Sequence, residues 1–140
     1  GERVRRPAAY DRGLIALAQR QAAASAGKAE IPCVVGDTMG ADGFYEEQGR
    51  GDGALCEYDD AAREAWLRRC HDAGVRNIEM EAPALAAFCG AAGIRVAALN
   101  TVIVNRFEGD QVRVSGADIA RMSANAGRLA LRMIAALDAA

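Results

Sequence analysis

Apolar residues repeat at helical spacing in four segments of the chain. The repeat is longest in the last segment, between residues 119 and 137. Three of the segments also open with residues suited to a helix start, namely Asp59 and Ser115 as N-caps and Pro83 in a first turn. The pattern predicts helices over residues 9–25, 60–71, 83–89 and 116–137.

Three shorter runs are rich in β-branched and other apolar residues, which is typical of buried strands. They cover residues 31–36, 75–80 and 94–104. Residues 38–56 contain several glycines and predict a long loop, in which Phe44 and Tyr45 favour an ordered and functional segment. This alternation of helices and strands predicts an α/β fold with a mostly parallel sheet covered by helices.

The composition leaves this picture unchanged but excludes several function classes. The 140 residues are 51% hydrophobic and 26% charged, which is typical of one soluble globular domain. A net charge of −2 argues against a nucleic-acid-binding protein or a polybasic membrane binder, since these carry a basic excess. No apolar run approaches the roughly 20 residues of a membrane helix, and residues 1–6 lack the apolar core of a signal peptide. We therefore expect a cytoplasmic protein.

Cysteine and histidine offer little for a metal site or a nucleophilic centre. The four cysteines form no CxxC pair, so the sequence predicts no metal site and reduced thiols that pack as small buried apolar groups. His71 is the only histidine and lies at the polar end of a predicted helix, so we expect it on the surface. A Ser–His–Asp or Cys–His scheme would have to include this residue.

Polar side chains that could bind a ligand follow the predicted strands, where open α/β sheets bind ligands. After the first strand, Gln48 offers an amide donor and acceptor, and Arg50 offers a fork of donors. Two such groups could bind a ring with alternating carbonyl and N–H groups; the alternative is a solvated polar loop. Phe44 could stack on the same ring or simply anchor the loop. Asn105 and Arg106 follow the last strand.

Two carboxylates mark the end of the second predicted strand. Glu79 and Glu81 flank Met80 and point in opposite directions if the backbone is extended. A carboxylate in this place could accept two hydrogen bonds from the vicinal hydroxyls of a ribose. The alternative is an acidic residue favoured by the dipole at the start of the next helix.

Several of these segments resemble the uridine phosphorylases, most closely those of the eukaryotic type. Residues 36–39, 44–50 and 52–56 resemble the base-binding loop of that family. Residues 74–81 resemble its ribose-binding segment, and residues 104–111 resemble the end of a late strand. These motifs occur in the order and spacing of the family, and the match extends over nearly all of the chain.

The resemblance implies part of the nucleoside phosphorylase fold, a central mixed sheet flanked by helices. Residues 1–140 would form the C-terminal half of such a domain, without the N-terminal half. It also implies reversible phosphorolysis of uridine to uracil and ribose 1-phosphate, with phosphate as co-substrate and no cofactor. In this family phosphate is bound by segments of the N-terminal half and by an arginine of a neighbouring subunit. We therefore expect a companion chain or N-terminal half, and a homo-oligomer or larger assembly.

The resemblance also implies roles for individual residues. The implied uracil-binding residues are Phe44, Gln48, Arg50 and Arg106, and the implied ribose-binding residues are Met80 and Glu81. Phe44 would stack on the base, and Arg106 would lie near the uracil O4. Arg50 and Glu81 are the implied catalytic residues, because Arg50 would stabilise the departing uracil anion and Glu81 would bind the ribose hydroxyls.

Two positions depart from the family pattern. Ala82 stands where uridine-specific members usually have serine, and Gly51 replaces a bulky apolar residue. Together with the missing phosphate-binding segments, these departures leave a catalytically inactive, structural subunit of a larger assembly as the alternative. Asn105 stands where purine-acting relatives tend to have an aspartic acid, which argues against a purine or methylthioadenosine-type substrate.

Overall fold

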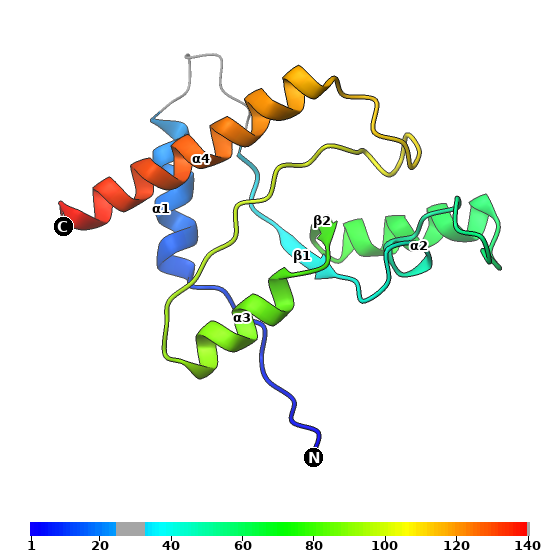
Figure 1. The fold of residues 1–140 in the computed structure, drawn as a ribbon, viewed down its shortest axis with the longest axis horizontal. Helices are drawn as coiled ribbons and strands as arrows, with labels where there is room; N and C mark the ends of the chain where they lie inside the picture. The colour runs from blue at the N-terminus through cyan, green and yellow to red at the C-terminus, as the bar shows by residue number, and fades with distance from the viewer. Residues whose placement is uncertain (25–32, 140) are drawn as a thin grey trace.

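The computed structural model describes residues 1–24 and 33–139 of the chain (Figure 1). Its elements are, in order, α1 (Arg12–Ala23), β1 (Asp37–Gly40), the 3-10 turn η1 (Glu46–Gln48), α2 (Asp60–Asp72), β2 (Val75–Glu79), α3 (Ala82–Ala91) and α4 (Gly116–Asp138). The α/β class and all four predicted helices are confirmed.

The helices begin where side chains can bond their free N–H groups. Asp59 accepts a hydrogen bond from the Ala62 N–H at 2.7 Å, and Ser115 accepts one from the Asp118 N–H at 3.1 Å. Both predicted N-caps are therefore confirmed. The first helix starts at residue 12 rather than residue 9, because Asp11 is its cap.

The two strands run parallel, with Gly40 opposite Glu79 at their carboxyl ends. Helix α3 packs against β1 and α2 packs against β2. A Cβ atom on Gly40 would lie 2.2 Å from Pro83 Cγ, so only glycine lets the end of β1 approach the start of α3 this closely. Because parallel strands end at one edge of a sheet, the segments after β1 and β2 start side by side.

Two of the three predicted strands differ from the structure. Residues 33–36 are irregular, residues 31–32 lie outside the described residues, and β1 falls at Asp37–Gly40, which overlaps the predicted loop. Residues 94–104 are extended, but no described backbone pairs with them in a ladder, and a strand needs such a partner. The described residues therefore form a two-stranded sheet.

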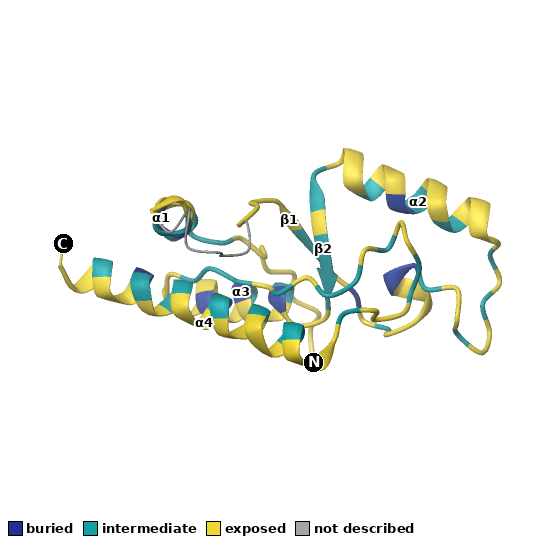
Figure 2. Cartoon of the chain, turned by 90° about the horizontal axis from the view of Figure 1, so that it is seen from above, coloured by how far each residue is buried: buried dark blue, intermediate teal, exposed yellow. Residues whose placement is uncertain are grey.

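The buried core is small for a chain of this length. Its main cluster is Leu17, Ala18 and Met133, where α4 crosses α1 (Figure 1). The accessible surface is 9685 Å², whereas a compact monomer of this mass would expose roughly 6,900 Å². Figure 2 shows exposed and half-buried residues along most of every helix, with few buried ones. Large apolar side chains such as Phe88 and Leu131 are about two-thirds exposed or more.

The predicted burial of the cysteines is confirmed only in part. All four thiols are free, yet only Cys89 is buried, while Cys56 and Cys70 are half-buried and Cys33 is exposed. Cys33 lies in the irregular segment before β1, which no described element covers. His71 is exposed, as expected.

The described residues contain neither a membrane-spanning helix nor a cluster of metal ligands. Within residues 1–24 and 33–139, no helix combines the length and apolarity that crossing a membrane requires. The same residues hold no cluster of three or more metal-ligating side chains.

Candidate functional site

The two candidate ligand-binding segments leave the same edge of the sheet. The Ala41 N–H, one residue past β1, donates to the Glu79 carbonyl at the end of β2 with an N···O distance of 2.8 Å. Figure 1 shows the chain turning away from both strand ends at this edge. The loop at 41–59 and the turn at 80–81 are thus anchored together, in the position where parallel sheets bind ligands.

The loop after β1 is ordered by contacts with α2 and within itself. Gly49 closes the turn η1 with a φ of 65°, and Trp66 of α2 lies so close that a Cβ on Gly49 would come within 2.5 Å of the indole. The Tyr58 hydroxyl donates to the Arg50 carbonyl and, at 3.3 Å, to the Glu46 carbonyl. Burial raises the pKa of Tyr58, so this hydroxyl stays protonated as a donor. The prediction of an ordered loop is confirmed.

Arg50 is held in one orientation by its neighbour Asp52. The Nε and Nη2 atoms of Arg50 donate to the two carboxylate oxygens at 2.7 and 2.5 Å. These hydrogen bonds hold the pKa of Asp52 below its ordinary value and raise that of Arg50, so both groups stay charged at neutral pH. The guanidinium also lies 4.8 Å from the centre of the Phe44 ring. This arrangement leaves Nη1 of Arg50 available to a ligand.

Gln48 is buried, with only 6% of its surface exposed. Its Oε1 atom accepts a hydrogen bond from Nη2 of Arg106 at 3.0 Å. The alternative of a solvated polar loop is therefore wrong for this residue. The structure brings Arg106 to Gln48 across 58 positions of sequence, and it places Arg50 over the Phe44 ring in the same loop as Gln48.

The two glutamates at the end of β2, Glu79 and Glu81, have different roles. Oε2 of Glu79 accepts from the N–H groups of Glu81 and Ala82 at 2.8 and 2.7 Å, so Glu79 satisfies the start of α3. Glu79 therefore matches the alternative prediction, an acidic residue favoured at the start of the next helix. Glu81 is exposed, and its Oε2 accepts only from the Met80 N–H at 3.2 Å. A carboxylate with one long backbone contact has lone pairs left for a ligand.

Both polar atoms of the Asn105 side chain form hydrogen bonds within the turn that begins at this residue. Its Nδ2 donates to Glu108 at 2.7 Å, and its Oδ1 accepts from the Phe107 N–H at 3.1 Å. The next residue, Arg106, is the one that faces the loop.

Four residues around the site received no role from the sequence, namely Asp52, Arg63, Asp110 and Gln111. Asp110 accepts from Arg106 and from Arg63 of α2, and Gln111 donates to Asp52 at 3.0 Å. The sequence carries a weak signal for the first contact, since Arg106 and Asp110 stand four residues apart. That spacing indicates a contact only where a helix is predicted, whereas here the two side chains meet in an irregular segment.

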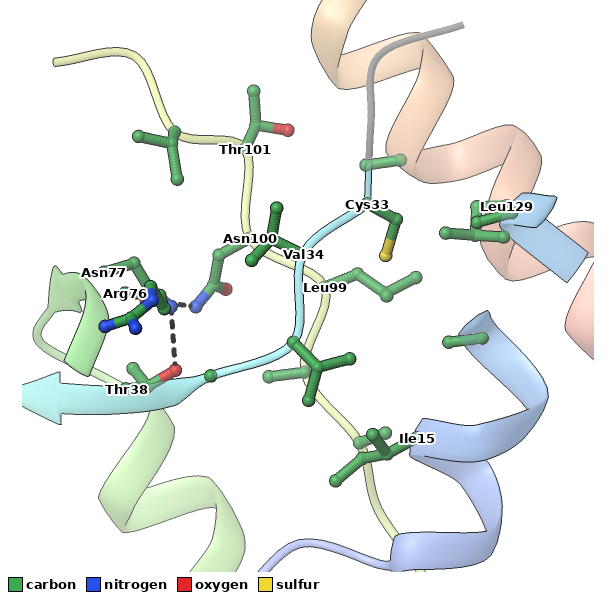
Figure 3. A pocket seen from close by; sticks show the side chains of 18 of the residues that line it. Ile15, Cys33, Val34, Thr38, Arg76, Asn77, Leu99, Asn100, Thr101 and Leu129 are labelled. Carbon is green, nitrogen blue, oxygen red and sulfur yellow. Dashed lines mark hydrogen bonds between the residues drawn. The ribbon is translucent and has the colours of Figure 1, made fainter. Parts of the chain in front are cut away.

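The predicted site residues do not line the main apolar cavity. That cavity, of about 440 Å³, lies between α1, α4 and the extended segment 97–102. Figure 3 shows Ile15, Val34, Leu99 and Leu129 on its walls, with Asn77 bonded to Thr38 and Asn100 at one side. Its lining is mainly apolar, unlike the polar group around Gln48.

Comparison with known proteins decides the family. The sequence profile of the phosphorylase superfamily matches residues 2–137. The chain belongs to the phosphorylase superfamily. A uridine phosphorylase of the oomycete Phytophthora capsici superposes with a TM-score of 0.88 at 37% identity, over 96% of this chain and 45% of that one. The predicted resemblance and the nucleoside phosphorylase fold are confirmed.

The relatives in this superfamily are much longer than this chain. Uridine phosphorylase 1 of Mus musculus is 48% identical over 83 residues, which are 59% of this chain and 27% of the mouse protein. A relative from Schistosoma mansoni, 40% identical over 82 residues, is named inactive uridine phosphorylase B; the match covers 59% of this chain and 28% of that protein. The chain thus spans less than half the length of these superfamily members.

Proposed function

We propose that this chain is the C-terminal half of a nucleoside phosphorylase-like domain and supplies the uracil- and ribose-binding half of a uridine phosphorylase. The reaction is the reversible phosphorolysis of uridine to uracil and ribose 1-phosphate. The observation that carries the proposal is the group of Gln48, Arg50 and Arg106, which two distant segments bring together at the carboxyl edge of the sheet. The names of the superfamily relatives support the same reaction.

The base-binding part of the proposal follows from the donors in this group. Uracil presents two carbonyl oxygens on either side of an N–H. Nη1 of Arg50 and Nε2 of Gln48 are donors that suit such oxygens. When the N-glycosidic bond breaks, the ring leaves as an anion, and donors already in place stabilise that charge. The Phe44 ring, 52% exposed, offers a face on which the base can stack.

The ribose-binding part of the proposal rests on Met80 and Glu81. Both are exposed at the end of β2, beside the start of the base-binding loop. The Glu81 carboxylate can accept hydrogen bonds from the sugar hydroxyls, and bonds to a charged acceptor are among the stronger ones. Its negative charge also favours the positive charge that the sugar develops as the bond breaks.

Phosphate is the nucleophile in this proposal, and no cofactor takes part. Its binding groups come from a complementary half of the domain and from a neighbouring subunit, in a homo-oligomer that acts in the cytoplasm. The exposed surface supports such a complement, since it exceeds that of a compact monomer by about 2,800 Å².

The test is phosphorolysis by the assembly that contains this chain. The chain and its complementary half are incubated with uridine and phosphate, and uracil and ribose 1-phosphate are measured by chromatography. We expect release of both products that stops when phosphate is left out. Adenosine in a parallel incubation tests the purine-type substrate, and we expect no adenine. A folded assembly that binds both substrates and releases no uracil would contradict the proposal.

A second candidate function is that of an inactive structural subunit. The Schistosoma relative named inactive shows that the superfamily contains such proteins, and Ala82 and Gly51 depart from the usual pattern of the active ones. The same incubation separates the two functions. A structural subunit would assemble with its partner and leave uridine intact.

Replacing Glu81 by alanine tests the ribose assignment. We expect the Kd for uridine to rise about 10- to 100-fold, which is the loss of hydrogen bonds to one charged group. Binding of free uracil should not change, because uracil has no sugar. Calorimetric titration with both ligands measures the difference. Glu64→Ala, which removes an exposed carboxylate from α2, is the matched control, and equal losses for uridine and uracil would refute the assignment.

A further inference from the structure

We propose that Asp110 is a positioning residue that fixes the side-chain amide of Gln48 through Arg106, and so restricts the site to bases with a carbonyl oxygen at that position. The identity of the ligand rests on the proposed function. The orientation of the amide rests on the contacts alone.

The Asp110 carboxylate connects three segments of the chain. Oδ1 accepts from Arg106 at 3.1 Å and from Arg63 of α2 at 3.2 Å, while Oδ2 accepts from the Gly51 N–H at 2.8 Å. Its side chain is only 10% exposed. A carboxylate this buried needs such partners. Removing it leaves Arg106 without its anion and leaves Arg63 with only the exposed Asp60.

Arg106 transmits this constraint to Gln48. One end of the guanidinium, Nη1, bonds to Asp110, and the other end, Nη2, bonds to Oε1 of Gln48 at 3.0 Å. A guanidinium has donors only, so it can face the carbonyl oxygen of an amide but not the NH₂ group. If the amide were rotated by 180°, its NH₂ group would face the guanidinium. Because Gln48 is buried, water could not replace the lost hydrogen bond. The Nε2 donor of Gln48 is therefore kept on the side away from Arg106.

Because the amide is fixed, the protein presents only hydrogen-bond donors to the base at these two positions. Nε2 of Gln48 and Nη1 of Arg50 can each bond to a carbonyl oxygen. An amino group at the same place on a base, as in cytidine, is itself a hydrogen-bond donor. It would face a donor of the protein and could form no hydrogen bond with it. Discrimination of this kind comes from the unfavourable contact with the wrong ligand as much as from the good contact with the right one.

The experiment compares Asp110→Asn with Asp60→Asn. Asp60 pairs with the same Arg63 at 3.3 Å, but its side chain is 93% exposed and touches neither Arg106 nor the loop. The ratio of kcat/KM for uridine to that for cytidine is measured for each protein in the assembled enzyme. We expect the ratio to fall by about tenfold or more in Asp110→Asn and to keep its wild-type value in Asp60→Asn. A merely structural role would lower activity on both substrates and leave the ratio unchanged.

A second readout needs no catalysis. The two side-chain amide protons of Gln48, assigned by Gln48→Glu, are observed in ¹⁵N-correlated NMR spectra. In the wild-type protein we expect them to be dispersed and slow to exchange with water, and in Asp110→Asn to move toward the positions of a free amide. Arg106→Gln is the substitute if Asp110→Asn does not fold, and the same changes are expected.

The outcomes separate this inference from the proposed function. If wild-type protein releases no uracil, the proposed function fails, and the amide signals still test the role of Asp110. If uridine is cleaved and the folded variant keeps the wild-type substrate ratio, the inference is overturned. Gln48 amide signals that stay at their wild-type positions in the folded variant overturn it as well.

Discussion

Replacing Arg50 by lysine is expected to lower kcat/KM for uridine by about 100- to 1,000-fold, the range seen when one donor to a developing anion is removed. Arg50 uses Nε and Nη2 to bind Asp52 and keeps Nη1 for the base. Lysine carries the same charge but has a single ammonium group, which cannot bond to both carboxylate oxygens and also reach the ligand in a fixed direction. The effect should therefore appear in kcat, because the anion forms only as the bond breaks.

Steady-state phosphorolysis of uridine, followed by the release of uracil, measures this effect. Arg121→Lys is the matched control, since Arg121 also pairs with an aspartate, Asp118 at 3.0 Å, but on α4. We expect this control to retain wild-type kcat. A fully active Arg50→Lys enzyme would remove Arg50 from the catalytic residues.

Replacing Gly49 by alanine is expected to reduce the free energy of unfolding by about 2–5 kcal/mol. Part of the loss is the left-handed backbone, since a φ of 65° costs a residue with a Cβ roughly 1–2 kcal/mol. The remainder is the clash of the new methyl group with Trp66, whose nearest ring carbon lies 2.5 Å from the ideal Cβ position. Forcing such a group into a packed site costs roughly 1–3 kcal/mol.

Urea denaturation measures the loss, and Trp66, the only tryptophan in the sequence, provides the fluorescence signal. Gly51→Ala is the matched control two residues away. Its new Cβ would have no neighbour closer than 3.7 Å, and we expect a change within about 0.5 kcal/mol. If the two variants were equally stable, the packing of Gly49 on Trp66 would not be the constraint on this loop.

Helix positions could be predicted from the sequence because their causes are local. Apolar spacing and a capping side chain act within a few residues, and Asp59 and Ser115 fulfil both conditions. Strand positions depend on a distant partner. Residues 94–104 have the apolar composition of a strand but no described partner, whereas Asp37–Gly40 forms one because β2 lies alongside. Composition alone does not contain that information.

The residues of the candidate site likewise differ in whether they could be predicted from the sequence. The residues that would touch a ligand, such as Gln48 and Arg50, could be singled out by side-chain chemistry and by the resemblance to a family. The residues that hold them, Asp52 and Asp110, could not. Their roles depend on which charged groups the fold brings within hydrogen-bonding distance, as at 3.1 and 3.2 Å for Asp110. An acidic residue in an irregular segment is by default expected to face water.

The segment at 94–104 affects how much folded protein can accumulate in a cell. Its backbone pairs with no described strand, and its apolar side chains are exposed, with Ile94 at 55% and Val102 at 54%. In both respects it resembles an uncovered sheet edge, which attracts other chains. Copies in which this segment stays uncovered would aggregate or be retained by chaperones. The amount of folded protein would then be limited by how completely the segment is covered rather than by the rate of synthesis.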